Sequence, residues 1–367
     1  MAKEIQIGNK TIGERRPCFI IAEAGVNHDG DIEKAKLLID IAKDTGVDVV
    51  KFQTWITEEI VTKDSKTCEY QKSNTGETSQ FDMIKKLELG FEEFKELKKY
   101  ADEKDIIFMS TPDDEKSVDF LFELGVPAFK IGSGELTNER MLVKIAKKKL
   151  PIILSTGMAT LEEVEEAVKT ITRAGNNQLI LLHCTSNYPA KLETVNMNAM
   201  LTMKKKFGLI TGYSDHTEGI AVPIVAALLG AEVIEKHYTY DKNAEGPDHK
   251  ASLNPDELKK MVQEIRRVEK LDEEEKKKEL KKIKNADVIL GSFNKGPVES
   301  ELEVMDVVRK SIVAYTDIRK GQIITKEVLS MKRPGTGLPS QDLPKVIGKK
   351  AKQDIAKDTL IKLEILE

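Results

Sequence analysis

Eight short apolar runs decide the fold, and each one ends in polar residues and precedes a helical pattern. They are FIIAEAG (19–25), VVKFQT (49–54), IIFMSTP (106–112), AFKIGSG (128–134), PIILSTG (151–157), LILLHCT (179–185), LITGYSD (209–215) and VIEKHYT (233–239). Nearly continuous apolar strands are typical of parallel sheets that are buried on both faces. Eight such strands alternating with helices predict an α/β fold, the (β/α)8 TIM barrel, whose active site lies at the C-terminal ends of the strands.

One connection in this pattern is far longer than the others. Residues 55–89, between the second and third strands, read WITEEIVTKDSKTCEYQKSNTGETSQFDMIKKLEL. Long connections at the catalytic face of a barrel are more often substrate loops than filler. We therefore expect residues 55–89 to form a lid.

The chain changes character after the eighth predicted helix. A charged run, DEEEKKKELKKIKN (272–285), is most simply a solvated helix end, and short strands separated by turns begin near residue 307. DIRKGQIIT (317–325) and DIAKDTLIK (354–362) resemble each other, which suggests an internal duplication. We therefore predict a barrel domain over 1–285, a linker over 286–306 and a small, mainly β domain over 307–367.

The composition excludes several classes of protein. A formal net charge of −4 over 367 residues gives no reason to expect a nucleic-acid partner. The three cysteines have neither metal-site nor redox spacing, and their odd number argues against a disulfide framework. No apolar signal core begins the chain, and no apolar run approaches the ~18 residues that span a bilayer. We expect a cytoplasmic protein with no membrane partner.

Two histidines follow neighbouring strands of the predicted barrel. His216 comes directly after the seventh strand, and His237 lies at the end of the eighth. Two imidazoles completed by water suit Mn²⁺, Fe²⁺ or Zn²⁺, and a water-rich octahedral site favours Mn²⁺ or Mg²⁺. We predict that His216 and His237 hold a divalent metal ion; the alternative is two separate hydrogen-bonding histidines.

Two lysines lie inside predicted buried strands. Lys51 and Lys130 would be costly there unless each is paired or used. They could grip an anion such as phosphate or carboxylate, and one could instead be a Schiff-base nucleophile. The structural alternative is a buried ion pair with an acidic residue. The side chains that could pair with the lysines are Glu23, Glu135 and Glu235, and those that could help them grip an anion are Gln53, Ser133, Ser155 and Ser214.

Two further segments carry candidate site residues. KIGSGE (130–135) and LSTGMAT (154–160) place Gly and Ser at strand ends, where backbone N–H groups can face phosphate oxygens. Glu135 could orient or deprotonate a water molecule beside a metal ion. Asp248, in the loop that follows the eighth strand, could bind sugar hydroxyl groups or could only shape a turn.

Ordered motifs along almost the whole chain resemble those of the sialic acid synthase family. The motifs are IAEAGVNHDGD, KFQT, EYQKSNTG, STPDDE, FKIGSGELTN, ILSTGMAT, LHCTSNYPA, GYSDHT, EKHYT and GPDHKAS, and RPGTGLP near the C-terminus resembles the antifreeze-like (SAF, β-clip) domain of that family. The resemblance implies a TIM barrel followed by a SAF domain. It also implies metal-dependent condensation of phosphoenolpyruvate with N-acetylmannosamine, in its open-chain aldehyde form, and water. The products would be N-acetylneuraminate and phosphate, formed by C–O cleavage.

The resemblance assigns roles to individual residues. It implies that Glu135, Glu23, Lys51 and Lys130 are catalytic, that Asn27 lies beside Glu23 at the floor of the site, and that His216 and His237 hold Mn²⁺, with Mg²⁺ or Co²⁺ possible. Phosphoenolpyruvate would be held by Lys51, Gln53, Lys130, Ser133, Ser155 and Ser214. The sugar would face Asn74, Tyr188, Asp248 and Arg333, with Arg333 reaching its N-acetyl group. Asp113 stands where the family pattern has Phe.

The same resemblance leaves alternatives open. N,N'-diacetyllegionaminate synthesis from 2,4-diacetamido-2,4,6-trideoxymannose is the main alternative, pseudaminate synthesis is a weaker one, and a Schiff-base aldolase using Lys51 or Lys130 is a remote one. The C-terminal domain read alone could be an ice-binding or carbohydrate-binding module, but a fold analogy carries no functional weight. The resemblance further implies a domain-swapped homodimer, in which the SAF domain of one chain caps the barrel of its partner.

Overall fold

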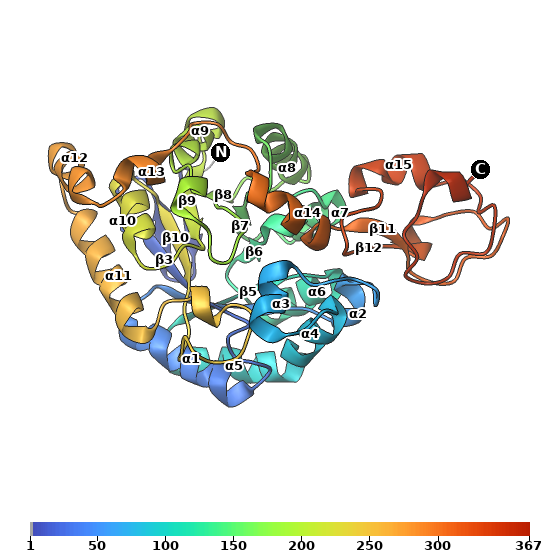
Figure 1. The fold of residues 1–367 in the computed structure, drawn as a ribbon, viewed down its shortest axis with the longest axis horizontal. Coiled ribbons are helices and arrows are strands. Elements are labelled where there is room, and N and C mark those ends of the chain that lie inside the picture. Colours follow the sequence, from blue (N-terminus) through green and yellow to red (C-terminus); the bar gives the residue numbers. More distant parts are fainter. Residues whose placement is uncertain (1–2) are drawn as a thin grey trace.

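The computed structural model describes residues 3–367 and has a barrel of eight parallel strands (Figure 1). The strands are β3 (Phe19–Gly25), β4 (Val49–Thr54), β5 (Ile107–Pro112), β6 (Phe129–Ile131), β7 (Ile152–Ser155), β8 (Leu179–His183), β9 (Ile210–Asp215) and β10 (Val233–His237). Each lies within one of the eight predicted runs, so the barrel prediction is confirmed. Their side chains are almost entirely buried, which explains why the runs are apolar throughout rather than alternating.

The strands pair in a nearly closed ring. The hydrogen-bonded order is β5-β4-β3-β10-β9-β8-β7-β6, and the two end strands, β5 and β6, pack against each other. An N-terminal hairpin of β1 (Glu4–Ile7) and β2 (Lys10–Gly13) places Ile5, Ile7 and Ile12 in the same apolar cluster as the inward-facing strand residues. The hairpin therefore closes the N-terminal end of the barrel, and the C-terminal end remains for the site.

A helix follows each barrel strand and packs around the ring (Figure 1). These helices are α1 (Ile32–Thr45), α5 (Phe91–Glu103), α6 (Glu115–Leu124), α7 (Glu139–Lys147), α8 (Leu161–Arg173), α9 (Asn198–Phe207), α10 (Ala221–Leu228) and α11 (Pro255–Val268). Their starts follow local chemistry: Thr160 and Glu163 form a capping box at α8, and Asn254 and Glu257 form another at α11. Within residues 3–367, no helix is long and apolar enough to cross a membrane.

The long connection forms three short helices over the edge of the barrel. They are α2 (Thr57–Ile60), α3 (Glu69–Thr75) and α4 (Gln80–Leu87). Trp55 and the buried residues of α2 and α4 pack into one apolar cluster, which stands apart from the barrel core. This arrangement leaves segment 55–89 over the C-terminal end of the strands, as a lid requires.

The C-terminal domain has a small core of its own. Its elements are β11 (Ser311–Ala314), β12 (Leu329–Lys332), α15 (Leu343–Val346) and short 3-10 turns at Lys326–Val328, Ser340–Asp342 and Leu363–Ile365. The two similar segments face each other, because Ile318 and Ile355 exchange backbone hydrogen bonds of 2.8 Å. The pairing is reciprocal: Asp354 accepts from Lys320 N, and Asp317 accepts from Lys357 N, each at 2.8 Å. This symmetry supports the predicted duplication.

The segment between the two domains is folded rather than extended. After α12 (Glu273–Lys282), which has no fully buried residue, it forms α13 (Ala286–Leu290), a 3-10 turn at Glu299–Glu301 and α14 (Leu302–Val308). The predicted linker therefore continues into a helix that lies against the barrel (Figure 1).

The loops of the barrel contain three further 3-10 turns. Ser133–Glu135 follows β6, His249–Ala251 follows β10, and Leu192–Thr194 lies between β8 and α9.

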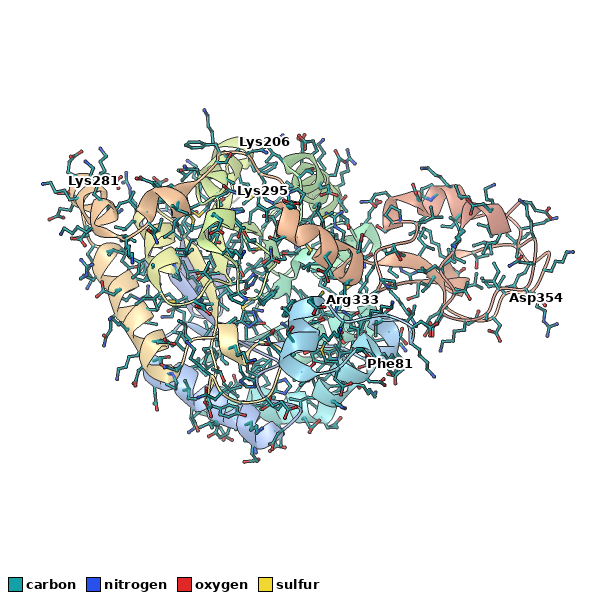
Figure 2. All side chains as sticks on the ribbon, in the orientation of Figure 1. Phe81, Lys206, Lys281, Lys295, Arg333 and Asp354 are labelled. Carbon is teal, nitrogen blue, oxygen red and sulfur yellow. The ribbon has the colours of Figure 1, made fainter. Side chains whose placement is uncertain are left out.

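Within the single chain that the structure describes, the C-terminal domain docks on the lid of its own barrel. Arg333 N donates to Ile60 O at 2.9 Å, and Thr62 N donates to Arg333 O at 3.0 Å. Figure 2 shows Arg333 where the C-terminal domain meets the lid, and Asp354 at the outer end of that domain. Arg333 therefore reaches the end of its own barrel within one chain. Association of two chains, and with it the domain swap, stays a prediction.

Candidate active site

A single pocket at the C-terminal end of the barrel gathers most of the predicted site residues. Its lining includes Glu23, Lys51, Gln53, Lys130, Ser133, Glu135, Ser155, Tyr188, Ser214, His216, His237, Asp248 and Arg333. They come from five or more strand ends, from the loops that follow, and from the C-terminal domain. Residues as far apart in the sequence as Glu23 and Arg333 therefore meet in one cavity, at the end of the barrel where the fold predicts the site.

Four charged side chains form the floor of the pocket. Lys51 Nζ lies 2.5 Å from Glu23 Oε2 and 3.5 Å from Glu235 Oε2, and Lys130 Nζ lies 3.2 Å from Glu235 Oε1. All four side chains are at most 4% exposed. Two cations and two carboxylates balance each other, so the buried ion pairs considered from the sequence are present. An anionic ligand in the pocket would bind to the same two ammonium groups that now pair with the carboxylates.

Burial and pairing set the protonation of this floor. Burial opposes the charged form of Lys51, but Glu23 and Glu235 outweigh it and raise its pKa. Burial would likewise raise the pKa of Glu235, yet Lys130 and Lys51 lower it to about 2. Glu23 differs, because burial outweighs the attraction of Lys51 and raises its pKa. Lys51 is thus held as a cation, and Glu23 is the carboxyl group of the floor that most readily takes a proton.

Hydroxyl and amide groups surround the two lysines. Gln53 Nε2 donates to Glu23 Oε1 at 3.1 Å, and Ser214 Oγ donates to Glu235 Oε1 at 2.8 Å. Ser133 Oγ accepts from Gly157 N at 2.9 Å. Ser155 Oγ is buried and has no hydrogen-bond partner within residues 3–367. An unpartnered buried hydroxyl beside two lysines suits an incoming anion, because it leaves a polar group for the ligand to satisfy.

The rings of the two predicted metal ligands lie close together, edge to face, in the pocket lining. The ring centroids of His216 and His237 are 5.6 Å apart. Thr185 O accepts from His216 Nδ1 at 2.6 Å, which leaves His216 Nε2 as the lone-pair nitrogen, 3.2 Å from the Tyr188 hydroxyl. Burial lowers the pKa of His216 to about 4, and burial together with His216 lowers that of His237 well below its usual range. Both rings are therefore neutral at pH 7, as metal ligation requires.

The donor set fits a divalent ion with an open coordination sphere. His237 Nδ1 is buried without a hydrogen-bond partner within the described chain, and the carbonyl of Thr185 orients His216 as an outer partner commonly orients a ligating imidazole. No cluster of three or more His, Cys, Asp or Glu side chains in residues 3–367 could hold an ion by itself. Two histidines would thus leave most positions to water or substrate, which suits Mn²⁺ better than a closed structural zinc site.

Glu135 is paired with a residue that the sequence did not indicate. Lys310, from the start of the C-terminal domain, lies with its Nζ 2.7 Å from Glu135 Oε1, and both side chains are 2% exposed. Lys310 Nζ also donates to Asp113 O at 2.5 Å. The carboxyl group of Asp113 lines the pocket, where burial raises its pKa against the attraction of Arg333. Asp113 therefore adds a polar group at the position where the family pattern has Phe.

The residues predicted to face the sugar divide into two groups. Tyr188, Asp248 and Arg333 line the pocket. Asn74 does not: its Nδ2 donates to Pro247 O at 2.8 Å, and its Oδ1 accepts from Lys250 at 3.2 Å. Its amide therefore holds the lid to the loop after β10, and its contact with the sugar stays a prediction.

Asn27 is likewise absent from the lining. Its Nδ2 donates to Tyr238 O at 2.8 Å and to Ser252 Oγ at 2.9 Å, and the side chain is fully buried. It therefore braces the strand ends beneath the pocket and does not touch the cavity.

The outer wall of the pocket is apolar, and sequence reasoning missed most of it. Its members come from the lid, from the β3 loop and from α14: Val26, Trp55, Ile60, Met83, Ile84, Leu87, Val304 and Val308. Tyr70 of α3 also lines the pocket, and its ring stacks on Tyr188 at a centroid distance of 5.4 Å. The helical spacing of Met83, Ile84 and Leu87 was the available signal, but spacing alone does not say whether such a face covers a core or a ligand.

Comparisons with known proteins agree with this site. The NeuB family model matches residues 38–277, and the SAF domain model matches residues 309–367. The N,N'-diacetyllegionaminic acid synthase of Legionella pneumophila is 45% identical over 98% of each chain. The human N-acetylneuraminate-9-phosphate synthase is 36% identical over 97% of this chain and 94% of its own.

A solved structure agrees with the whole architecture. The spore coat polysaccharide biosynthesis protein SpsE of Bacillus subtilis superposes with a TM-score of 0.81 at 36% identity, covering 99% of both chains. The fold, the pocket and these matches lead to one conclusion: this chain belongs to the NeuB family of sialic acid synthase-like enzymes and carries a C-terminal SAF domain.

Proposed function

We propose that this enzyme condenses phosphoenolpyruvate with the open-chain aldehyde of an N-acetylmannosamine-type sugar and water, giving a nine-carbon 2-keto acid and phosphate. The observation that carries the proposal is the meeting of two halves in one pocket. One half is an anion site built from Lys51, Lys130 and the unpartnered hydroxyl of Ser155. The other is a pair of buried neutral imidazoles, His216 and His237.

Each half has a chemical task in the proposed reaction. Lys51 and Lys130, with Gln53, Ser133, Ser155 and Ser214 around them, would fix the carboxylate and phosphate groups of phosphoenolpyruvate. A divalent ion held by His216 and His237, most simply Mn²⁺ and alternatively Mg²⁺ or Co²⁺, would supply Lewis-acid polarisation of the aldehyde.

The remaining charged groups suit the steps that follow carbon–carbon bond formation. Glu135 is an ionisable carboxylate held by Lys310 at the pocket wall, so it can orient the water that adds to C2 and take its proton. Loss of phosphate by C–O cleavage then completes the reaction, and the paired lysines stabilise the departing anion. Arg333, which lines the pocket beside the lid, would donate to an acetyl carbonyl of the sugar.

A specific observation favours one acceptor over the other. The apolar outer wall, which includes Met83, Ile84 and Leu87, suits methyl groups better than hydroxyl groups. 2,4-Diacetamido-2,4,6-trideoxymannose carries an acetamido group at C4 and a methyl group at C5, where N-acetylmannosamine carries a hydroxyl group and a hydroxymethyl group. The 45% identity to a legionaminic acid synthase supports the same choice. We therefore propose the diacetamido sugar as the better acceptor and N-acetylmannosamine as the second candidate.

Phosphate release tests both parts of this proposal. The purified chain with phosphoenolpyruvate and Mn²⁺ is assayed with each sugar, and the keto-acid product is identified by mass spectrometry. We expect phosphate only when both substrates are present, with kcat/KM for the diacetamido sugar at least about tenfold higher, the range set by a methyl group in an apolar pocket. If neither sugar gave phosphate release, the proposed reaction would be contradicted. A higher kcat/KM for N-acetylmannosamine would reverse the choice of acceptor.

A further inference from the structure

The segment that joins the two domains is fastened to the loop after β7. We call residues 295–309 the strap; Figure 2 labels Lys295 at its start. Lys295 is 4% exposed, and its Nζ donates to Ala159 O at 2.6 Å. At the other end, Arg309 donates to Met158 O at 2.8 Å and forms an ion pair of 2.8 Å with Glu163. The β7 loop is therefore held at both ends of the strap.

A buried carboxylate in the middle of the strap joins two loops of the barrel. Glu301 is 2% exposed, and its Oε1 accepts from Met158 N at 2.9 Å and from Ser186 N at 2.7 Å. Its other oxygen accepts from Val298 N at 3.0 Å. Met158 follows β7 and Ser186 follows β8, so one carboxylate oxygen fixes these neighbouring loops relative to each other.

The two loops meet at a crowded point beside the anion site. A Cβ on Gly157 would lie 2.2 Å from Ser186 Oγ and 2.9 Å from Ser133 Oγ, so only glycine fits there. Gly157 N donates to Ser133 Oγ at 2.9 Å, and Ser155 lies two residues before it. A small shift of the Met158 or Ser186 backbone would therefore be passed directly to Ser133 and Ser155, because packed atoms leave no room to absorb it.

We propose that Glu301 is a positioning residue that sets the shape of the phosphoenolpyruvate site from outside the pocket. The inference rests on the proposed function, because it assigns Ser133 and Ser155 to that substrate. Glu301 itself does not line the pocket, so its influence passes through the two loops. Charge-assisted bonds to backbone N–H groups are roughly twice as strong as neutral ones, which suits a carboxylate to this task.

The test compares two glutamates of the same 3-10 turn. Glu301→Gln keeps the shape but removes the charge and turns an amide N–H toward one backbone N–H. Glu299 is exposed, so Glu299→Gln is the matched control. Phosphoenolpyruvate affinity is measured by calorimetry without a sugar, and KM for each substrate, kcat and Tm are measured in parallel. We expect Glu301→Gln to weaken phosphoenolpyruvate binding about tenfold while KM for the sugar changes less than about twofold.

Each outcome decides the proposal. Unchanged phosphoenolpyruvate affinity in Glu301→Gln would overturn it, and so would a lowered Tm with both substrates affected equally, since that indicates structural support only. Glu301→Ala should weaken phosphoenolpyruvate binding further than Glu301→Gln does. A wild-type protein that binds phosphoenolpyruvate but turns over no sugar would contradict the proposed function alone. The phosphoenolpyruvate affinities of wild type, Glu301→Gln and Glu299→Gln would still test the role of Glu301. A wild-type protein that does not bind phosphoenolpyruvate would overturn both.

Discussion

Lys51 Nζ and Glu23 Oε2 lie 2.5 Å apart at the floor of the pocket, and both side chains are 2% exposed. A lysine that forms a Schiff base must first lose its proton, and such lysines have a lowered pKa. Here burial is outweighed by Glu23 and Glu235, and the pKa of Lys51 is raised. The ion pair therefore favours a cation that binds anions over an amine that attacks carbonyl groups.

Borohydride should not trap a covalent intermediate. We expect no lysine adduct in the intact mass, and no loss of activity, when the enzyme is treated with borohydride in the presence of phosphoenolpyruvate and the sugar. The physical reason is the charged state of Lys51. A reduced adduct on Lys51 or Lys130, located by peptide mass spectrometry, would instead support the aldolase alternative.

Removing either imidazole of the pair should remove the metal ion. We expect His216→Ala and His237→Ala each to lose bound Mn²⁺ and to reduce kcat by about a hundredfold or more. The reason is that the protein supplies only these two ligands, so either variant would hold the ion by a single imidazole. Metal content is measured after gel filtration. His183 is a buried histidine outside the pocket lining, so His183→Gln should keep its metal. Full activity of the wild-type enzyme after chelation would contradict the assignment.

The contact between Arg333 and the lid predicts that the SAF domain acts on its own barrel. Arg333→Ala and His237→Ala are each expected to be nearly inactive. Mixed and refolded together, they should stay inactive, because Arg333 lines the same pocket as His237 of its own chain. A domain swap would instead give one intact site in each mixed dimer, and activity would recover to roughly a quarter of wild type. Subunit exchange is verified by mass-tagged chains.

Acid should destabilise the fold through a buried neutral histidine. Burial lowers the pKa of His183 to about 3, whereas the unfolded chain has the ordinary value of about 6.5. Below pH 6.5 the unfolded state takes up a proton that the folded state does not. The free energy of unfolding therefore decreases as the pH is lowered from about 6.5 to about 3. At pH 5 the loss is about 2 kcal/mol.

Urea unfolding at pH 7.5 and pH 5 measures that loss. The free energy of unfolding of His183→Gln should fall by about 2 kcal/mol less between the two pH values than that of the wild type. The absolute stability of the variant does not matter, because only the difference between the two pH values is compared. Equal differences in the two proteins would show that His183 does not carry the effect.

The sequence predicted those parts of the molecule that depend on local pattern and on strand order. Buried parallel strands leave long apolar runs, so all eight strands could be located, and polar residues at their ends could be expected to converge. His216 and His237 could be paired for the same reason. The capping box of Thr160 and Glu163 is also local, because its two residues lie three positions apart in the sequence.

Contacts made by the chain after it leaves the barrel could not be predicted. Lys310 and Glu301 lie in segments whose path no periodicity describes, yet they pair with Glu135 and with the β7 and β8 loops. The hydrogen bonds of the Asn74 amide to Pro247 and Lys250 are a further example, because no local pattern announced them. The tertiary partners of a polar side chain are set when distant segments pack together, so the spacing of residues along the chain does not predict them.

The fate of one oxygen atom tests the central claim most directly. Phosphoenolpyruvate labelled with ¹⁸O at the bridging position is incubated with the enzyme, Mn²⁺ and the diacetamido sugar, and the phosphate and keto acid are analysed by mass spectrometry. If paired lysines hold the anion while C–O cleavage releases it, the label appears in inorganic phosphate. Label retained in the keto-acid product would contradict this account, because the phosphorus–oxygen bond would then be the one that breaks.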